Sequence, residues 1–475
     1  MNDSYSFPVQ HPLNRREALR RIGGGFGSLA LAGLLAEPPS AVASAENPLA
    51  PKPPHFSARA MRVIFLFMEG GPSHHDTFDY KPLLVRDQGK PLPMETPRVN
   101  SNPDRFGKVL GPLSQFKQRG ESGIWISDLF PKLAQVADEL CVINSMHCSN
   151  TQHGAAVLEL HTGHGLLIRP SMGSWITYGL GTENQNLPGY ITICQPLSLA
   201  GTGVYSSAFL PAAHQGTPLG YRNTPSSEAK FRFIQNKSAR VDLQRAEMDF
   251  VRESGEAQLV RTGPDSELEA RIRSFELAFQ MQMEAPEVQD VSKESAATKK
   301  LYGLDQEETK NLGYQCLLAR RFAERGVRFV QCNLGGWDLH NKISSEMPKV
   351  ARQADQPIAA LIEDLKSRGL LQDTLILWGG EFGRTPVTEG PDGRDHNPYG
   401  YTMWMAGGGT KKGTTYGRTD DYGYYAIENK VHVHDLHATV LHVLGLDHTK
   451  LTYPYAGRNF RLTDVHGEVV KGILS

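Results

Sequence analysis

The sequence predicts an α/β fold in which a mostly parallel sheet is sandwiched by helices. Short apolar runs of strand length alternate along the chain with amphipathic segments of helix length. Three runs combine a glycine pair with a carboxylate just past the apolar residues, and they lie at Arg62–Gly71, Val327–His340 and Thr374–Arg384. Ligands of open α/β sheets gather outside the carboxyl ends of the strands. The three runs therefore point to one site built from several loops.

Each predicted element follows from its local pattern. Apolar runs predict strands at these ranges: Arg62–Met68, Leu140–Asn144, Gly189–Ile193, Thr374–Trp378, and runs that begin at Val327 and Tyr401. Helical periodicity predicts helices near these ranges: His153–Thr162, Val350–Arg368 and Asp435–Gly445. In the last helix, Asp435 is suited to the N-cap and Gly445 to the stop.

The chain divides into three predicted parts. Residues 1–45 read as an export signal, residues 46–60 contain Pro and Ala and predict a linker, and residues 61–475 form the α/β domain. Within this domain, residues from about 225 to 325 are rich in charged side chains spaced through Leu and Phe, as in Leu268–Phe279. This amphipathic pattern predicts a helical insertion.

The first 45 residues resemble a twin-arginine (Tat) signal peptide. Arg15 and Arg16 precede a mildly apolar stretch, Phe26–Ala36, and the run Ala43–Ala45 offers a small-residue cleavage site. A stretch of about 11 apolar residues is too short for a bilayer core of ~30 Å, so no permanent membrane anchor is expected. We therefore expect a periplasmic or secreted protein whose first partner is the Tat export machinery.

Composition excludes several classes of protein. The chain has 475 residues, of which 39% are hydrophobic and 21% charged, as is typical of a globular domain. The formal net charge is −1, so no global field favours nucleic acid as a partner. None of the five cysteines sits in a CxxC pair, so a zinc–thiolate site has no support.

Two loops carry the sharpest candidates for metal chemistry. In Asp338-Leu-His340, a carboxylate and an imidazole two residues apart can ligate one metal ion. Glu381 follows a strand and two glycines and is a further candidate ligand. Arg384 could hold an anionic substrate with two parallel hydrogen bonds, or it could pair with Glu381 at the surface.

Two further residues complete the predicted ligand set. His396 precedes the run at Tyr401, and Asp395 could accept a hydrogen bond from its imidazole. Glu69 ends the first predicted strand and is followed by two glycines. Both positions are suited to ligating a metal at the sheet edge.

Thr151 and His153 lie between a predicted strand and a predicted helix. A helix N-terminus favours an anion, and a hydroxyl there could act as a nucleophile if a metal lowers its pKa. Thr151 is therefore either a nucleophile or a helix cap, and His153 is a candidate ligand or base.

Six motifs together resemble a bacterial, typically Tat-exported family, the domain-of-unknown-function 1501 family, within the alkaline phosphatase/sulfatase superfamily. The motifs are Glu69–Pro82, Gly335–His340, Gly379–Pro386, Asp395–Pro398, Asp420–Gly423 and His437–His448. The resemblance covers nearly all of residues 61–475 and implies an alkaline phosphatase-like fold.

The resemblance implies two metal sites around a nucleophile at a helix N-terminus. It divides the candidate ligands as follows: Asp338, His340 and His396 in one site, and Glu69, Glu381 and a group from Thr151 or His153 in the other. The chain departs from the superfamily at three points. The usual nucleophile position falls at or near His153, the sulfatase signature Cys/Ser-x-Pro-x-Arg is absent, and Phe382 stands where alkaline phosphatases often have a histidine.

The sequence thus favours an exported, metal-dependent hydrolase of phosphate or sulfate esters, acting on a small-molecule or glycan ester. The alternative is a non-catalytic metal- or ligand-binding envelope protein that keeps the fold, since the standard nucleophile is missing. Mixed carboxylate and imidazole ligands suit Zn, Mn or Fe, whereas an all-oxygen second site would suit Ca or Mg.

Overall fold

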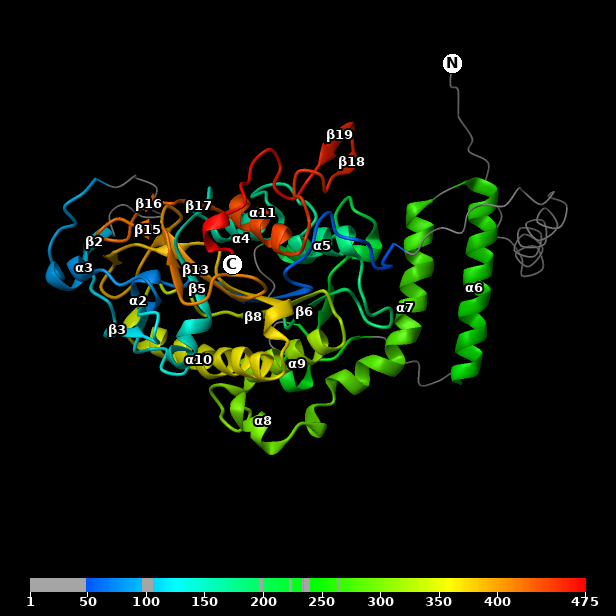
Figure 1. The fold of residues 1–475 in the computed structure, drawn as a ribbon, viewed down its shortest axis with the longest axis horizontal. Helices are drawn as coiled ribbons and strands as arrows, with labels where there is room; N and C mark the ends of the chain where they lie inside the picture. Colours follow the sequence, from blue (N-terminus) through cyan, green and yellow to red (C-terminus); the bar gives the residue numbers. More distant parts are fainter. Residues whose placement is uncertain are drawn as a thin grey trace, which may run out of the picture.

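The computed structural model describes residues 48–95, 106–195, 200–221, 224–232, 234, 240–263 and 265–475 (Figure 1). The predicted signal peptide, residues 1–45, lies outside the described residues. From residue 48 onward the predicted linker is hydrogen-bonded to the domain, with the Lys52 amide donating to Leu180 and the His55 amide to Gly445.

The centre of the fold is a sheet whose strands follow the order β14-β5-β13-β9-β1-β8-β6-β7, with β17 paired to β5. Its strands have these bounds: β1 Arg62–Met68, β5 Leu140–His147, β6 Tyr190–Ile193, β7 Thr217–Leu219, β8 Phe329–Leu334, β9 Thr374–Gly379, β13 Tyr401–Gly407, β14 Thr414–Tyr416 and β17 Val431–His432. Among these strands, β13 runs antiparallel to both of its neighbours, and every other pairing is parallel.

The two faces of the sheet are buried against different helices. Along β1, Val63, Phe65 and Phe67 pack into one apolar core, and the residues between them pack into the other. The first core is completed by α4 His153–Thr162, α5 Met172–Leu180 and α11 Val433–Val443, and the second by α9 Lys310–Glu324 and α10 Ile343–Ser367. Figure 1 shows these two groups of helices above and below the sheet. The predicted α/β architecture is confirmed.

Helices dominate the stretch predicted as an insertion. The helices α6 Val241–Thr262 and α7 Ser266–Gln289 stand side by side at the edge of the fold (Figure 1), joined by an ion pair of 2.9 Å between Arg245 and Glu276. The C-terminal part of α7 reaches the main core through Met281, Ala285 and Val288. The last helix of the stretch, α9, is part of the layer beneath the sheet.

Two predicted helices begin elsewhere than expected. The N-cap of α11 is His432, whose amide donates to the Asp435 carboxylate at 2.8 Å, so Asp435 is the third helical residue and not the cap. The helix α10 begins at Ile343 and includes Pro348 and Pro357.

The remaining elements are short. Their bounds are α2 His74–Thr77, α3 Pro82–Arg86, α8 Ala296–Leu301, β2 Phe106–Val109, β3 Phe116–Arg119, β4 Ile124–Ser127, β10 Gly383–Arg384, β11 Val387–Glu389, β12 His396–Asn397, β15 Arg418–Thr419, β16 Ala426–Glu428, β18 Tyr453–Tyr455 and β19 Arg458–Phe460. No helix in the described part of the chain is both long and apolar enough to cross a bilayer.

Candidate metal centre

The strand register brings the candidate loops to one edge of the sheet. Met68 at the end of β1 lies opposite Leu334 of β8, and Phe67 lies opposite Gly379 of β9. The chain therefore leaves three adjacent parallel strands at the same edge. His396 reaches this edge from the other direction, because β13 is antiparallel and its N-terminal end lies where its neighbours have their C-terminal ends.

Four side chains converge at this edge. The ligand atoms of His153, Asp338, His340 and His396 all lie within 4.8 Å of one another. The Asp338 Oδ1 atom is 3.1 Å from His153 Nε2, 3.0 Å from His340 Nε2 and 3.5 Å from His396 Nε2. Ligand atoms of one tetrahedral metal ion, with bonds of about 2.0–2.1 Å, lie roughly 3.3–3.4 Å apart. The Nε2 atoms of His340 and His396 are 2.9 Å apart, so these separations are close to the spacing of ligands around a single metal ion.

Each of the three histidines has its other ring nitrogen engaged. The Nδ1 atom of His153 lies 2.6 Å from the Glu381 carboxylate, and that of His396 lies 2.7 Å from the Thr151 carbonyl oxygen. The Nδ1 atom of His340 contacts the buried carboxylate of Glu389. A donor hydrogen on each Nδ1 leaves the Nε2 lone pair for a metal, which is the arrangement typical of metal-bound histidine.

Arg384 is buried beside Asp338 and fixes its position. Its Nη2 atom donates to Asp338 Oδ1 at 2.7 Å and to the Gly70 carbonyl, while Nε donates to Gly71 at 3.0 Å and Nη1 to Arg394 at 3.1 Å. Four of the five guanidinium N–H groups are therefore committed to the protein. The structure gives Arg384 a positioning role at Asp338, and a contact with substrate stays a prediction.

The other predicted site residues surround the centre in different ways. Glu381 is fully buried, accepts from the Gly70 amide at 3.1 Å and orients His153 rather than joining the four converging atoms. Thr151 contacts the centre through its carbonyl oxygen. Glu69 is part-buried at the end of β1 and lines a neighbouring cleft with Gly335.

A close backbone approach holds these loops together. Gly70 has a φ of +112°, and a Cβ atom there would lie 2.4 Å from the Asp338 amide nitrogen. Only glycine satisfies both the left-handed backbone and the contact. The glycine after Glu69 thus allows the β1 loop to touch the loop that carries Asp338.

The pKa values of the four converging side chains are shifted in different directions. Burial alone would lower the pKa of His153, but hydrogen bonds to Asp338 and Glu381 outweigh it and raise the pKa to about 9. The hydrogen bond with Asp338 also raises the pKa of His340, whereas burial lowers the pKa of His396. Burial opposes ionisation of Asp338, yet the three histidines and Arg384 hold its pKa well below the usual range. In the absence of metal, an extra proton on His153 balances the charge of the Asp338 carboxylate.

Sequence reasoning missed Glu389. This residue ends the short strand β11, seven residues before His396, and its side chain is 7% exposed. A carboxylate at a strand end was the available signal, but no strand was predicted there. Glu389 and Asp395 also lie within 4.8 Å of a His340 ring nitrogen.

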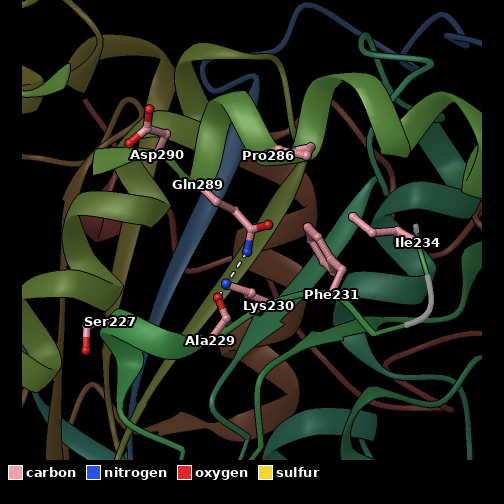
Figure 2. Close-up of a pocket in the computed structure, with 8 residues that line it drawn as sticks. All are labelled: Ser227, Ala229, Lys230, Phe231, Ile234, Pro286, Gln289 and Asp290. Atoms are coloured by element: carbon pink, nitrogen blue, oxygen red, sulfur yellow. Dashed lines mark hydrogen bonds between the residues drawn. The ribbon is translucent and has the colours of Figure 1, made fainter. Parts of the chain in front are cut away.

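One cavity in the structure lies away from the four converging side chains, so the presence of a cavity does not by itself identify the candidate metal centre. It has a volume of about 390 Å³, is lined by Phe231, Ile234 and Pro286 among others, and lies between the loop that follows residue 226 and the end of α7 (Figure 2). None of its lining residues belongs to the converging set.

The fold and the centre define an α/β protein with a candidate metal site at the carboxyl edge of its sheet. The chain belongs to the family described as "Protein of unknown function (DUF1501)", whose model matches residues 60–474. This is the family that the six sequence motifs resemble. No curated protein matches the chain in sequence.

Several solved structures are similar to this chain. They include the lipoteichoic acid synthase LtaP from Listeria monocytogenes, with 10% identity, a TM-score of 0.35, and 87% of this chain and 78% of that chain covered. The PsFucS1 sulfatase from Pseudoalteromonas sp. has 13% identity, a TM-score of 0.35, and 81% and 68% covered. The alkaline phosphatase from the Antarctic bacterium TAB5 has 9% identity, a TM-score of 0.34, and 81% and 98% covered. At these scores the neighbours add no argument to the strand order and the site geometry.

Proposed function

We propose that this protein is an exported, metal-dependent hydrolase of phosphate or sulfate esters. The observation that carries the proposal is the convergence of three histidine Nε2 atoms on Asp338 Oδ1, with every Nδ1 atom held by an acceptor. Such prior orientation suits a metal site better than a chance cluster of histidines.

The donor set fits a divalent transition metal. Three imidazoles and one carboxylate suit Zn, Mn or Fe, whereas Ca and Mg prefer oxygen ligands. A bound divalent ion supplies Lewis acidity and lowers the pKa of a water molecule at the site. The Asp338 side chain is 46% exposed, so the centre is open to a substrate.

The charges of the centre favour an anionic substrate. A divalent cation with the Asp338 carboxylate and three neutral imidazoles carries a net positive charge on the open side of the centre, where the Arg384 guanidinium lies beside Asp338. The carboxylates of Glu381 and Glu389, which offset this charge, lie behind His153 and His340. A phosphate or sulfate ester complements this charge. In the proposed hydrolysis, water oxygen bonds to phosphorus or sulfur, the bond to the alcohol oxygen breaks, and the alcohol leaves with a proton. His153, His340, His396 and Asp338 would hold the ion, and Arg384 fixes the position of Asp338.

A specific observation favours the non-catalytic alternative. The first residue of α4, where a nucleophile is expected from the resemblance, is His153, and it faces Asp338 and Glu381. Direct attack by water does not need that nucleophile, so hydrolysis stays our preferred function. Under the alternative, the protein binds metal and an anionic ligand without turnover.

Elemental analysis of the protein from its native compartment, combined with a panel of aryl and glycan phosphate and sulfate esters, tests the proposal. We expect about one transition metal ion per chain and hydrolysis that chelation abolishes and metal restores. A metal-loaded protein that hydrolyses no ester in the panel would establish the binding function instead.

Export has its own test. Replacement of Arg15 and Arg16 by lysine should trap the precursor in the cytoplasm, whereas the native chain should yield a mature N-terminus near Glu46. Normal export of the double variant would exclude the Tat route.

A further inference from the structure

A polar cleft opens beside the metal centre at the carboxyl edge of the sheet. Its volume is about 680 Å³. Its lining comes from the ends of β1, β6 and β8, from α9 and the residues just before it, and from the loop around residue 226. A cleft of this size accommodates one or two sugar rings, within the usual range for small-molecule sites.

The cleft and the metal centre are built from adjacent stretches of the chain. Gly336 lines the cleft, and Asp338 follows two residues later, so their Cα atoms are at most about 7 Å apart. On the other side, Glu69 lines the cleft and precedes Gly70, whose amide donates to the Glu381 carboxylate that holds His153. A substrate with its anionic group at the centre therefore has the cleft within reach of its remaining part.

The cleft is negative among the residues that the structure describes. Its lining carries the carboxylates of Glu69, Glu228 and Glu307 against the single ammonium group of Lys310. That ammonium group is already paired with Glu307 at 2.5 Å. A second anionic group on the substrate would meet repulsion here, whereas a neutral or cationic group would not.

The remaining lining favours hydrogen bonding over apolar packing. Hydroxyl and amide groups come from Thr224, Ser227 and Asn311, and backbone is exposed at Gly335 and Gly336. The described lining includes no aromatic side chain on which a flat aryl group could stack. Polar groups and open backbone suit a polyhydroxylated ligand.

We propose that this cleft holds the alcohol part of the ester, and that this part is a neutral or amino sugar rather than a second anionic group. The inference rests on the proposed function for the anionic end, but the cleft can be tested without any ester. The sugar class follows from charge and lining alone.

Binding of three pyranoses of similar size separates the possibilities. D-glucosamine is cationic, D-glucose neutral and D-glucuronate anionic, and their dissociation constants can be measured by NMR titration of the full-length, metal-loaded protein at low salt. We expect glucuronate to bind roughly three- to tenfold more weakly than glucosamine, and the gap to shrink in 1 M salt, where the Debye length falls to about 3 Å.

Variants locate the effect. Glu228→Lys should narrow or invert the preference, whereas Glu253→Lys, on the exposed face of α6, should leave it unchanged. The order should also persist in Asp338→Asn, which separates binding in the cleft from binding at the metal and from the failure of ester hydrolysis. Equal or tighter binding of glucuronate by Asp338→Asn as well as by the native protein, or no binding of any of the three sugars, would overturn the proposal.

Discussion

Two groups of histidines in this molecule differ in what their Nε2 atoms contact. In the candidate metal centre, His153, His340 and His396 direct their Nε2 atoms to one carboxylate oxygen, Asp338 Oδ1. Between α4 and α11, His434 Nε2 donates to Gly163 at 2.9 Å and His437 Nε2 donates to Leu160 at 2.7 Å. In the second group, each Nε2 atom donates to a different backbone carbonyl, so these histidines connect α11 to α4.

The difference teaches that histidine density does not define a metal site. What defines it is a shared target for the Nε2 atoms and an acceptor for each Nδ1 atom. The pKa values show the same contrast. Carboxylates outweigh burial at His153 and raise its pKa to about 9, whereas burial lowers the pKa of His437 to about 3.

The largest expected loss of metal affinity comes from a change at Asp338, the carboxylate that the three histidines share. Asp338→Asn keeps the shape of the side chain but removes the charge on which the three histidines converge. We expect metal affinity and any ester hydrolysis to fall together, by more than the roughly 100-fold that loss of an orienting partner costs. Elemental analysis and hydrolysis rates provide the measurement. Asp421→Asn, at an exposed turn, is the matched control and should change neither quantity.

Removal of an orienting acceptor should have the next largest effect. Glu389→Gln leaves His340 in place but weakens the hold on its Nδ1 atom. We expect metal affinity to fall about 10–100-fold, measured by competition with a chelator. Glu428→Gln, on the exposed strand β16, serves as the control. Unchanged affinity in Glu389→Gln would show that the orientation of His340 is not set by Glu389.

The affinity of the centre for metal should fall as the pH falls. Because the pKa of His153 is raised to about 9, this histidine carries an extra proton near neutral pH when no metal is bound, and the pKa of His340 is shifted in the same direction. Metal must displace the proton on His153, so metal affinity should rise with pH up to about 9, by up to about tenfold per pH unit for each proton released.

Without metal, the same pKa shift acts on folding in the opposite direction. The pKa of His153 is above its ordinary value of 6.5, so its contribution to stability is fully present below pH 6.5 and is lost as pH rises through about 9.

Metal affinity that does not change between pH 6 and 9 would contradict the predicted release of a proton from His153 on metal binding.

The smallest effect on metal content is expected from a change in the second group of histidines, between α4 and α11. His437→Phe removes a buried donor and leaves the Leu160 carbonyl without it. We expect the free energy of unfolding to fall by about 1–3 kcal/mol with metal content unchanged, measured by denaturant titration and elemental analysis. Loss of metal in this variant would erase the distinction between the two groups.

Much of the fold follows from local patterns. The bounds of β1 and α4 agree with the predicted Arg62–Met68 and His153–Thr162, since apolar runs and helical periodicity act within one element. The direction of β13 was not predicted, because strand direction depends on long-range pairing. The start of α10 was missed, as Pro348 lies within its second turn.

The sequence predicted most of the residues at the site, but not which of them converge on one point and which orient the others. Asp338, His340, His396 and His153 were all candidates, and the structure brings them together. Glu381 was expected to ligate metal, yet it lies behind His153, a distinction that depends on side-chain direction and burial. Glu389 was missed because its proximity to His340 arises only when β11 is folded against the loop that follows β8.

The most direct test of the account is the position of the metal. Anomalous diffraction from crystals of the protein purified with its native metal would locate the ion. The account predicts a peak about 2.0–2.2 Å from the Nε2 atoms of His153, His340 and His396 and from Asp338 Oδ1. A peak elsewhere, such as between α4 and α11 or at Glu69 alone, would contradict it, as would the absence of a peak from active protein.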